Sequence, residues 1–106
     1  KTPKGRMKAT VSAAKLEKRC EEVSLLLKAL AHPRRLMIMG HLVGGEKTVG
    51  ELQERCGISQ SQLSQFLARM RLEGLIACER RGRFQYYAPA DERVVELMRA
   101  IQRIYC

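Results

Sequence analysis

The stretch GISQSQLSQFLARM, residues 57–70, decides the fold of this chain. Its apolar residues Leu63, Phe66, Leu67 and Met70 recur at the spacing of a helix face, and Gly74 lies just beyond them. The first half of the stretch carries serines and glutamines where a solvated helix normally carries Lys and Glu. Because uncharged amides and hydroxyls both donate and accept hydrogen bonds, this side suits a surface that reads another molecule's donors and acceptors.

The residues before this helix predict a second, shorter one. In TVGELQERC, Thr48 is followed three residues later by Glu51, which is the pattern of a capping box, and Gly57 is placed to end the helix. Ser59 and Gln62 repeat the capping pattern at the start of the next helix. Two short helices joined by CGIS form a helix-turn-helix unit.

Helical spacing of apolar residues predicts two further helices upstream. The first runs through Leu16–Leu30 and the second through Leu36–Val43. Pro33 suits the first turn of the second helix, and Gly44–Gly45 ends it.

After Gly74 the period of the sequence changes. LIACERRGRFQYYAP alternates and turns at Arg81–Gly82, which predicts a two-stranded hairpin with a basic tip. Asp91 is a suitable N-cap for a final helix. The apolar stripe of that helix contains Val94, Leu97, Met98, Ile101 and Tyr105.

The predicted order is four helices, two strands and a helix (α-α-α-α-β-β-α). This mainly α fold with a small β-hairpin wing is a winged helix-turn-helix domain, expected over residues 14–106. Residues 1–13 are expected to form a basic tail, in which Met7 could be the native start.

Composition narrows the choice of partner. The 106 residues fit one domain and include 20 Lys and Arg against 11 Asp and Glu, a net charge of +9. Such an excess favours a polyanion or an anionic membrane surface, although it also fits an inert solvated surface. No run of about 18 apolar residues predicts a membrane span, and no signal peptide is recognisable, so a cytoplasmic protein is expected.

The candidate nucleic-acid contacts lie on the second helix of the pair and at the hairpin tip. If that helix enters a major groove, its first turns face base edges and backbone. The hairpin arginines would then lie on phosphates or in a minor groove, or else form a solvated charged turn. Ser59 and Gln62 could instead serve only as caps. The candidates are Gln60, Ser61, Gln62, Ser64, Gln65, Arg69, Arg80, Arg81 and Arg83.

The motifs LLKALAHPRRLMIMGHL, TVGELQERCGISQSQLSQFLARMRLEGLI and FQYYAP together resemble the ArsR/SmtB winged-helix repressors, and the resemblance covers Leu16 to Cys106. It implies a homodimer joined through the first and last helices, which covers an imperfectly palindromic DNA operator until an inducer releases it. It also places Ser61, Ser64 and Gln65 at the groove-reading positions, whereas Phe66 stands where many relatives have His. The stripes Leu16/Val23/Leu27 and Leu97/Ile101/Tyr105 are expected to be buried between subunits.

The resemblance also bears on the inducer. Metal-sensing members carry cysteines where this chain has Thr48 and Gly50, or His ligands along a last helix that here contains none, so no metal or other cofactor is expected. The sequence is most similar to the branch that senses reactive sulfur, whose last helix ends in YC. Those proteins pair that cysteine with one at the position of Gly40.

A switch that links two cysteines would therefore need a different partner for the terminal cysteine of this chain. Cys106 is the candidate reactive thiol and Cys20, on the first helix, is its candidate partner, with an oxidant or reactive sulfur species as inducer. Alternatively, Cys20 is a small interface hydrophobe, Cys106 an exposed terminal thiol, and the inducer a metal(loid) or another molecule. Cys56 and Cys78 are expected to point inward.

Two other classes of protein, enzymes and protein-binding winged helices, fit the sequence less well. An enzyme would need a converging nucleophile, base and acid, and the isolated His32 and His41 provide no such set. A winged helix that binds only proteins would not need both the polar helix side and the basic hairpin tip. The sequence therefore predicts a DNA-binding repressor.

Overall fold

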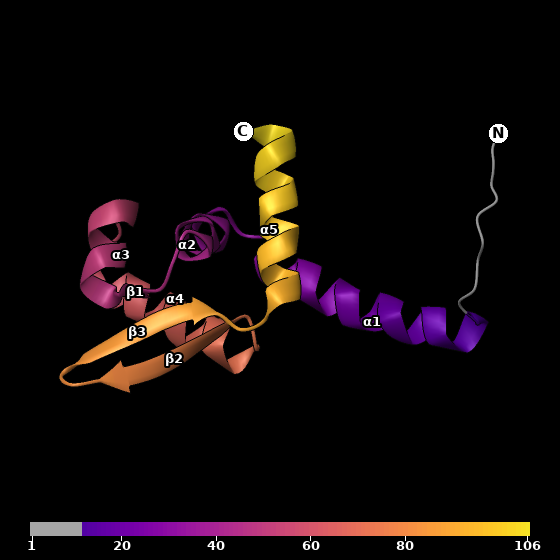
Figure 1. Cartoon of the computed structure of the whole chain (residues 1–106), viewed down its shortest axis with the longest axis horizontal. Helices are drawn as coiled ribbons and strands as arrows, with labels where there is room; N and C mark the ends of the chain where they lie inside the picture. Colours follow the sequence, from indigo (N-terminus) through magenta and orange to yellow (C-terminus); the bar gives the residue numbers. More distant parts are fainter. Residues whose placement is uncertain (1–11) are drawn as a thin grey trace.

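The computed structural model describes residues 12–106 and contains the predicted elements in the predicted order, with one short strand added (Figure 1). Most of the predicted basic tail, residues 1–11, lies outside the described residues. The elements are α1 (Ala13–Leu30), α2 (Pro33–Val43), β1 (Lys47–Thr48), α3 (Val49–Cys56), α4 (Gln60–Leu72), β2 (Ile76–Arg81), β3 (Phe84–Pro89) and α5 (Glu92–Tyr105).

Side-chain caps set where the helices begin. The capping box predicted at Thr48 and Glu51 is confirmed: the Glu51 backbone N–H donates to Thr48 Oγ1 at 3.2 Å, and the Thr48 N–H donates to Glu51 Oε1 at 2.8 Å. Asp91 caps α5 by accepting from the N–H groups of Arg93 and Val94. These bonds satisfy backbone donors that have no partner within the helix.

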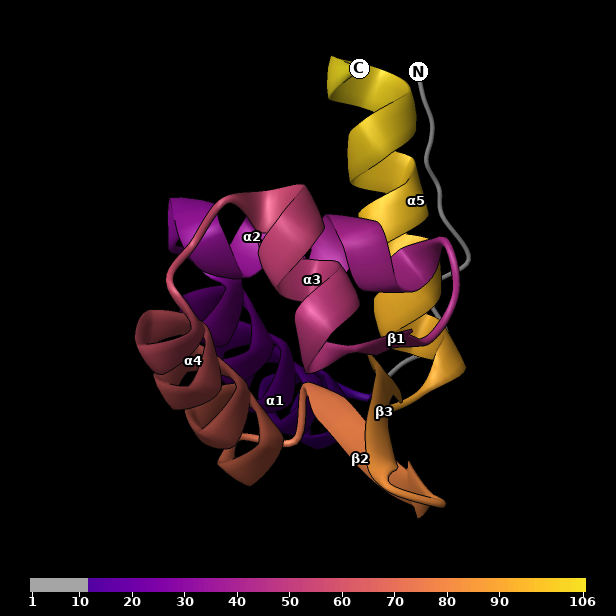
Figure 2. The ribbon, with the colours of Figure 1, turned by 90° about the vertical axis from the view of Figure 1, so that its left-hand side faces the viewer.

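The core lies where α2, α3 and α4 meet, with α2 in the middle (Figure 2). From α2 it takes Ile38, Met39 and Leu42, which are fully buried. Leu52 of α3 and the apolar side of α4 pack against the same cluster. Because this burial removes the apolar side of α4 from water, the serines and glutamines of that helix face outward.

The sheet has three antiparallel strands in the order β1-β3-β2, one more than the sequence predicted. Its hairpin pairs Arg81 with Phe84, so the turn is at Gly82–Arg83, one residue later than the predicted turn. Gly82 adopts φ 65°, which favours glycine. Strand β1 pairs Lys47 with Tyr87 and thereby connects the hairpin to the start of α3.

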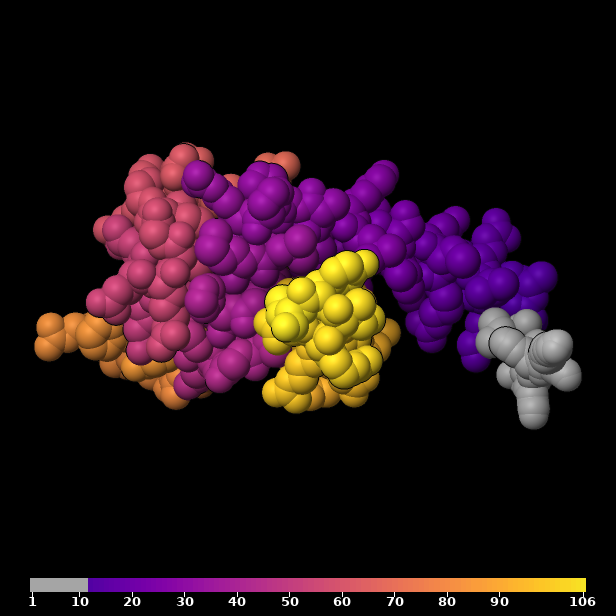
Figure 3. Space-filling model, turned by 90° about the horizontal axis from the view of Figure 1, so that it is seen from above, coloured from indigo at the N-terminus to yellow at the C-terminus, as the bar shows by residue number. Residues whose placement is uncertain are grey.

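Helix α1 projects from the rest of the molecule (Figures 1 and 3). Leu30 is its single buried residue in 18, while Leu16, Val23, Leu25 and Leu27 are exposed. At the end of α5, Tyr105 is also exposed, whereas Leu97 and Ile101 pack partly against the core of their own chain. Only the last turns of α1, with Leu26, Ala29 and Leu30, pack against the core. Because an amphipathic helix gains most of its stability by burying its apolar side, the rest of that side lacks a packing partner among the described residues.

Candidate nucleic-acid interface

Helix α4 presents the predicted polar residues on its exposed side. Gly57, with φ 66°, turns the chain out of α3, and Ser59 Oγ then accepts from the Gln62 backbone N–H at 3.2 Å. Ser59 is therefore the cap of this helix. The predicted residues Gln60, Ser61, Gln62, Ser64, Gln65 and Arg69 are all exposed, while Leu63, Leu67 and Met70 are buried.

Most of these exposed groups have no protein partner. Within the described residues, the side chains of Gln60, Ser61, Ser64 and Gln65 take part in none of the hydrogen bonds. Four uncharged groups thus line the first turns of α4 with their donors and acceptors available to a ligand. This arrangement can form hydrogen bonds with the base edges of a DNA groove.

Gln62 differs from its neighbours because its side chain has a partner. The sequence offered Gln62 as the second member of a capping box, but its Oε1 accepts instead from Arg34 Nη1 of α2, at 3.1 Å. One turn further along α4, Phe66 packs edge-on against the ring of His32, with 5.1 Å between ring centroids. Sequence reasoning missed this contact between the start of α2 and α4, although the HPRR segment supplies all of the α2 residues involved.

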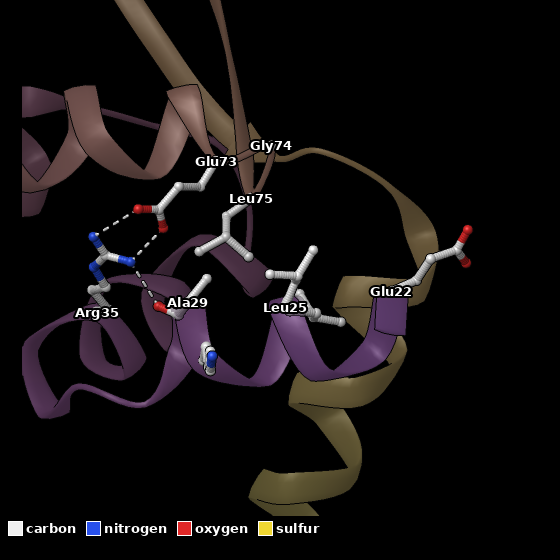
Figure 4. Close-up of a pocket in the computed structure, with 9 residues that line it drawn as sticks. Glu22, Leu25, Ala29, Arg35, Glu73, Gly74 and Leu75 are labelled. Atoms are coloured by element: carbon white, nitrogen blue, oxygen red, sulfur yellow. Dashed lines mark hydrogen bonds and ion pairs between the residues drawn. The ribbon is translucent and has the colours of Figure 1, made fainter. Parts of the chain in front are cut away.

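Arg35 connects three helices at the far end of α4 (Figure 4). Its Nη1 donates to Glu73 Oε1 at 2.6 Å and to the Ala29 carbonyl oxygen of α1 at 2.8 Å. Arg69 also lies beside Glu73, with 3.4 Å between Nε and Oε2. The hydrogen bond from Arg35 and the charges of both arginines hold the pKa of the Glu73 carboxyl below its ordinary value. Arg69, one of the predicted nucleic-acid contacts, therefore shares its charge with a carboxylate while its side chain stays mainly exposed.

The three hairpin arginines are not equivalent. Arg81 forms an ion pair with Glu46 and lies over the ring of Tyr86, 4.0 Å from its centroid. The hydrogen bond with Glu46 raises the pKa of Arg81. Arg80 Nε donates to the Gly82 carbonyl oxygen at 3.3 Å. Arg83, in the turn, has no side-chain hydrogen bond or ion pair among the described residues, so its charge remains fully available.

The four cysteines are all free thiols. Cys20 and Cys106 are exposed, while Cys56 and Cys78 pack partly against the core, as the sequence predicted. Burial raises the pKa of the Cys56 thiol. Gly40 faces α5: a Cβ built on it would lie 3.4 Å from Gln102 Nε2. The C-terminal end of α5 points away from α1 in both views (Figures 1 and 2).

The described part of the chain provides neither a metal site nor a membrane-spanning helix. Residues 12–106 contain no group of three or more His, Cys, Asp or Glu side chains placed to hold a metal ion. Among the same residues, no helix combines the length and apolar character that crossing a membrane requires.

Comparisons with known proteins assign the family. The protein-family model described as "Bacterial regulatory protein, arsR family" matches residues 32–77 of this sequence. The biofilm growth-associated repressor of Xylella fastidiosa is 41% identical over 91 residues, which are 86% of this chain and 80% of that protein. This chain belongs to the ArsR family of bacterial regulatory proteins.

Solved structures agree with this assignment. The crystal structure of a predicted DNA-binding transcriptional regulator from E. coli matches with a TM-score of 0.84 and 38% identity, covering 89% of this chain and 100% of that one. A homodimeric winged helix-turn-helix DNA-binding domain from Mycobacterium bovis, a possible ArsR-family regulator, matches with a TM-score of 0.72 and 32% identity, covering 91% and 88%. The ArsR-family fold is therefore a winged helix-turn-helix, as predicted, and the proteins of this family are transcriptional regulators, not enzymes.

The Arg35–Glu73 pair generates a pH-dependent prediction. Glu73→Gln is expected to lower the free energy of unfolding near neutral pH, because the variant keeps the size of the side chain but loses the charge that Arg35 contacts. Since folding lowers the pKa of Glu73 from its usual 4.5, the stabilisation is present above that value and is lost as pH falls through the lowered pKa. Urea denaturation of parent and variant across the acidic range measures the difference.

The matched control is Glu96→Gln. Glu96 is exposed on α5 and forms no ion pair with any described residue, so its loss is expected to change stability little at any pH. A Glu73→Gln deficit that stayed constant into strong acid would show that the charge of Glu73 is not what stabilises this contact.

Proposed function

We propose that this chain is a sequence-specific transcriptional repressor that binds operator DNA as a homodimer and leaves it when an inducer acts. The observation that carries the proposal is the unpartnered polar side of α4, Ser61, Ser64 and Gln65, beside a hairpin whose tip carries Arg80 and Arg83. The net charge of +9 favours a polyanionic partner, and the Xylella fastidiosa relative is named a repressor. Operator DNA of a bacterial cell lies in the cytoplasm, where we place the protein.

Direct readout follows from the residue types on α4. An amide side chain can pair with adenine through both its oxygen and its nitrogen, and a serine hydroxyl can bond to a base edge or a phosphate. With α4 in the major groove, Gln65 reads a base while Gln60, Ser61 and Ser64 contact bases and backbone. Arg83 and Arg80 contact phosphates beside the groove, and Arg81 braces the hairpin through Glu46.

Gln65→Ala is expected to weaken binding to the operator by about 1–3 kcal/mol and to relax its sequence preference, because the variant loses base-edge hydrogen bonds. Fluorescence anisotropy with the promoter upstream of the protein's own gene, and with a scrambled duplex of equal length, measures both effects. Arg83→Ala is the contrasting variant, expected to weaken both duplexes alike and to reduce the salt dependence. If Gln65→Ala binds the operator as tightly as the parent, the proposed position of α4 in the major groove, with Gln65 on a base, is wrong.

Dimerisation through α1 and α5 is the second part of the proposal. The supporting observation is the exposed apolar surface of α1, which the chain itself leaves uncovered, together with Tyr105 at 82% exposure. A two-fold dimer would cover both surfaces and would present two α4 helices to an imperfect palindrome. Adjacent major grooves on one side of a duplex lie about 34 Å apart, which sets the spacing of the two half-sites.

Leu27→Glu is expected to convert the dimer to a monomer, because it places a charge in the proposed apolar contact between subunits. Sedimentation velocity at micromolar concentration measures the change in mass. Leu72→Glu is the matched control, because Leu72 is 85% exposed on α4, outside the proposed contact. A parent protein that sediments as a monomer would refute the dimer itself.

The inducer is the third part, and we propose a reactive sulfur species acting on Cys106. An exposed thiolate accepts a sulfur atom from a low-molecular-weight persulfide, leaving Cys106 as a persulfide and releasing the donor as a thiol. A second thiolate then attacks the inner sulfur, forming a disulfide and releasing hydrogen sulfide. Cys20 is the proposed second thiol, and since the C-terminal end of α5 points away from α1 within one chain, it would come from the partner subunit.

Cys106→Ser is expected to remain on the operator under a persulfide concentration that releases the parent, because the variant lacks the sulfur acceptor. Anisotropy follows release, and mass spectrometry of the treated parent tests for a linked Cys20–Cys106 peptide. Cys56→Ser serves as the control, because Cys56 packs partly against the core. If Cys106→Ser is released like the parent, the inducer acts elsewhere on the protein.

A further inference from the structure

The N-terminal end of α2 lies along one edge of α4, from its first turn to its end. His32, Arg34 and Arg35 contact Phe66, Gln62 and Glu73, respectively. The α4 positions 62, 66 and 73 are spaced by four and seven residues, so they share one side of the helix. Gln62 therefore lies at the border of the exposed polar side, next to α2.

The two adjacent arginines of α2 have different environments. The Arg35 side chain is only 14% exposed, and its charge is paired with Glu73. Arg34 is exposed, and within residues 12–106 no carboxylate forms an ion pair with it. Among the described residues its side chain forms one hydrogen bond, to Gln62, so no described residue neutralises its positive charge.

The contact with Arg34 also fixes the orientation of the Gln62 amide. A guanidinium carries only donors, so the atom of Gln62 that faces it must be the carbonyl oxygen. The amide nitrogen then points elsewhere and remains a donor. Beside the first turn of α4, the remaining N–H groups of Arg34 and the NH₂ of Gln62 form a set of donors with one uncompensated positive charge.

We propose that Arg34 binds a backbone phosphate of the operator at the edge of the groove that α4 enters, away from the hairpin, and that Gln62 holds its guanidinium in place. This inference rests on the proposed DNA binding. A helix in the major groove has a phosphate backbone on each side of it, and in Figure 2 the N-terminal end of α2 lies above α4 whereas the hairpin lies to the right of α4. The planar guanidinium matches two phosphate oxygens, and the amide of Gln62 can donate to the same group.

The proposal changes the role of Gln62. The sequence made it a candidate DNA contact or only a cap, and bidentate pairing with adenine would require its oxygen as an acceptor. That oxygen is directed at Arg34, at the border next to α2, with one lone pair remaining, so we assign Gln62 the role of a positioning residue for a backbone contact. Such a contact adds affinity for any sequence and increases the salt dependence, but it adds little discrimination between sequences.

The experiment compares binding by the full chain to the operator and to a scrambled duplex at several salt concentrations. Arg34→Met is expected to weaken both duplexes by the same factor and to reduce the slope of log K against log salt by about 2, since each phosphate contributes about 0.9 and a dimer carries two copies. Arg34→Lys is expected to restore the slope. Arg103→Met, which removes the same charge from the exposed side of α5, is the matched control and is expected to leave the slope unchanged.

Gln62→Leu separates positioning from base reading. It is expected to weaken both duplexes equally while the salt slope stays that of the parent, because Arg34 keeps its charge but loses its support. Loss of affinity for the operator alone would show that Gln62 reads a base and would overturn its positioning role. A slope for Arg34→Met equal to that of Arg103→Met would overturn the phosphate contact.

These outcomes are distinct from failure of the proposed function. A parent protein that binds neither duplex refutes DNA binding and the Arg34 contact together. A parent that prefers its operator, with Arg34→Met indistinguishable from it, refutes only the contact. Because Arg34 is exposed, the variant is expected to unfold at the same temperature as the parent, which circular dichroism verifies.

Discussion

Burial of Leu63, Leu67 and Met70 in the core is the constraint on which the candidate interface depends. These side chains are at most 1% exposed, and fully burying one of this size contributes roughly 1.5–3 kcal/mol. A surface hydrogen bond contributes only about 1 kcal/mol, so the apolar side of α4 decides how the helix is rotated. Turning α4 by one residue would bury Ser64 without a partner. The outward direction of Ser61, Ser64 and Gln65 is therefore a consequence of packing, and it exists before any ligand arrives.

Local signals in the sequence predicted most of the fold. The capping box at Thr48, the cap at Asp91 and the turn at Gly57 each depend on residues within four positions of one another, and all three are confirmed. Strand β1 could not be predicted in this way, because two residues have no recognisable period. Its partner on β3, Tyr87, is also forty positions from Lys47, so the pairing is set by the tertiary fold.

The sequence also predicted part of the candidate interface. Helical periodicity identified which residues of α4 are exposed, but it could not show which arginines have acidic partners. Arg81 pairs with Glu46 across 35 positions, Arg35 pairs with Glu73 across 38, and Arg34 bonds to Gln62 across 28. The sequence alone therefore does not distinguish the basic residues that have acidic partners from those that have none. In the folded chain they divide into arginines that brace the structure, such as Arg35 and Arg81, and arginines whose charge is unpaired, such as Arg34 and Arg83.

This division has a consequence for how a change between subunits would reach the DNA. Arg35 joins the carbonyl of Ala29, at the end of α1, to Glu73, at the end of α4, and Leu30 is buried in the same core. The C-terminal part of α1 is therefore attached to α4 through a nearly buried charge, and separating them would leave that charge without its partners. If α1 lies between subunits, as proposed above, a change in that contact would be expected to move α4 together with α1. It would alter the spacing between the two α4 helices while leaving the polar side of each helix intact.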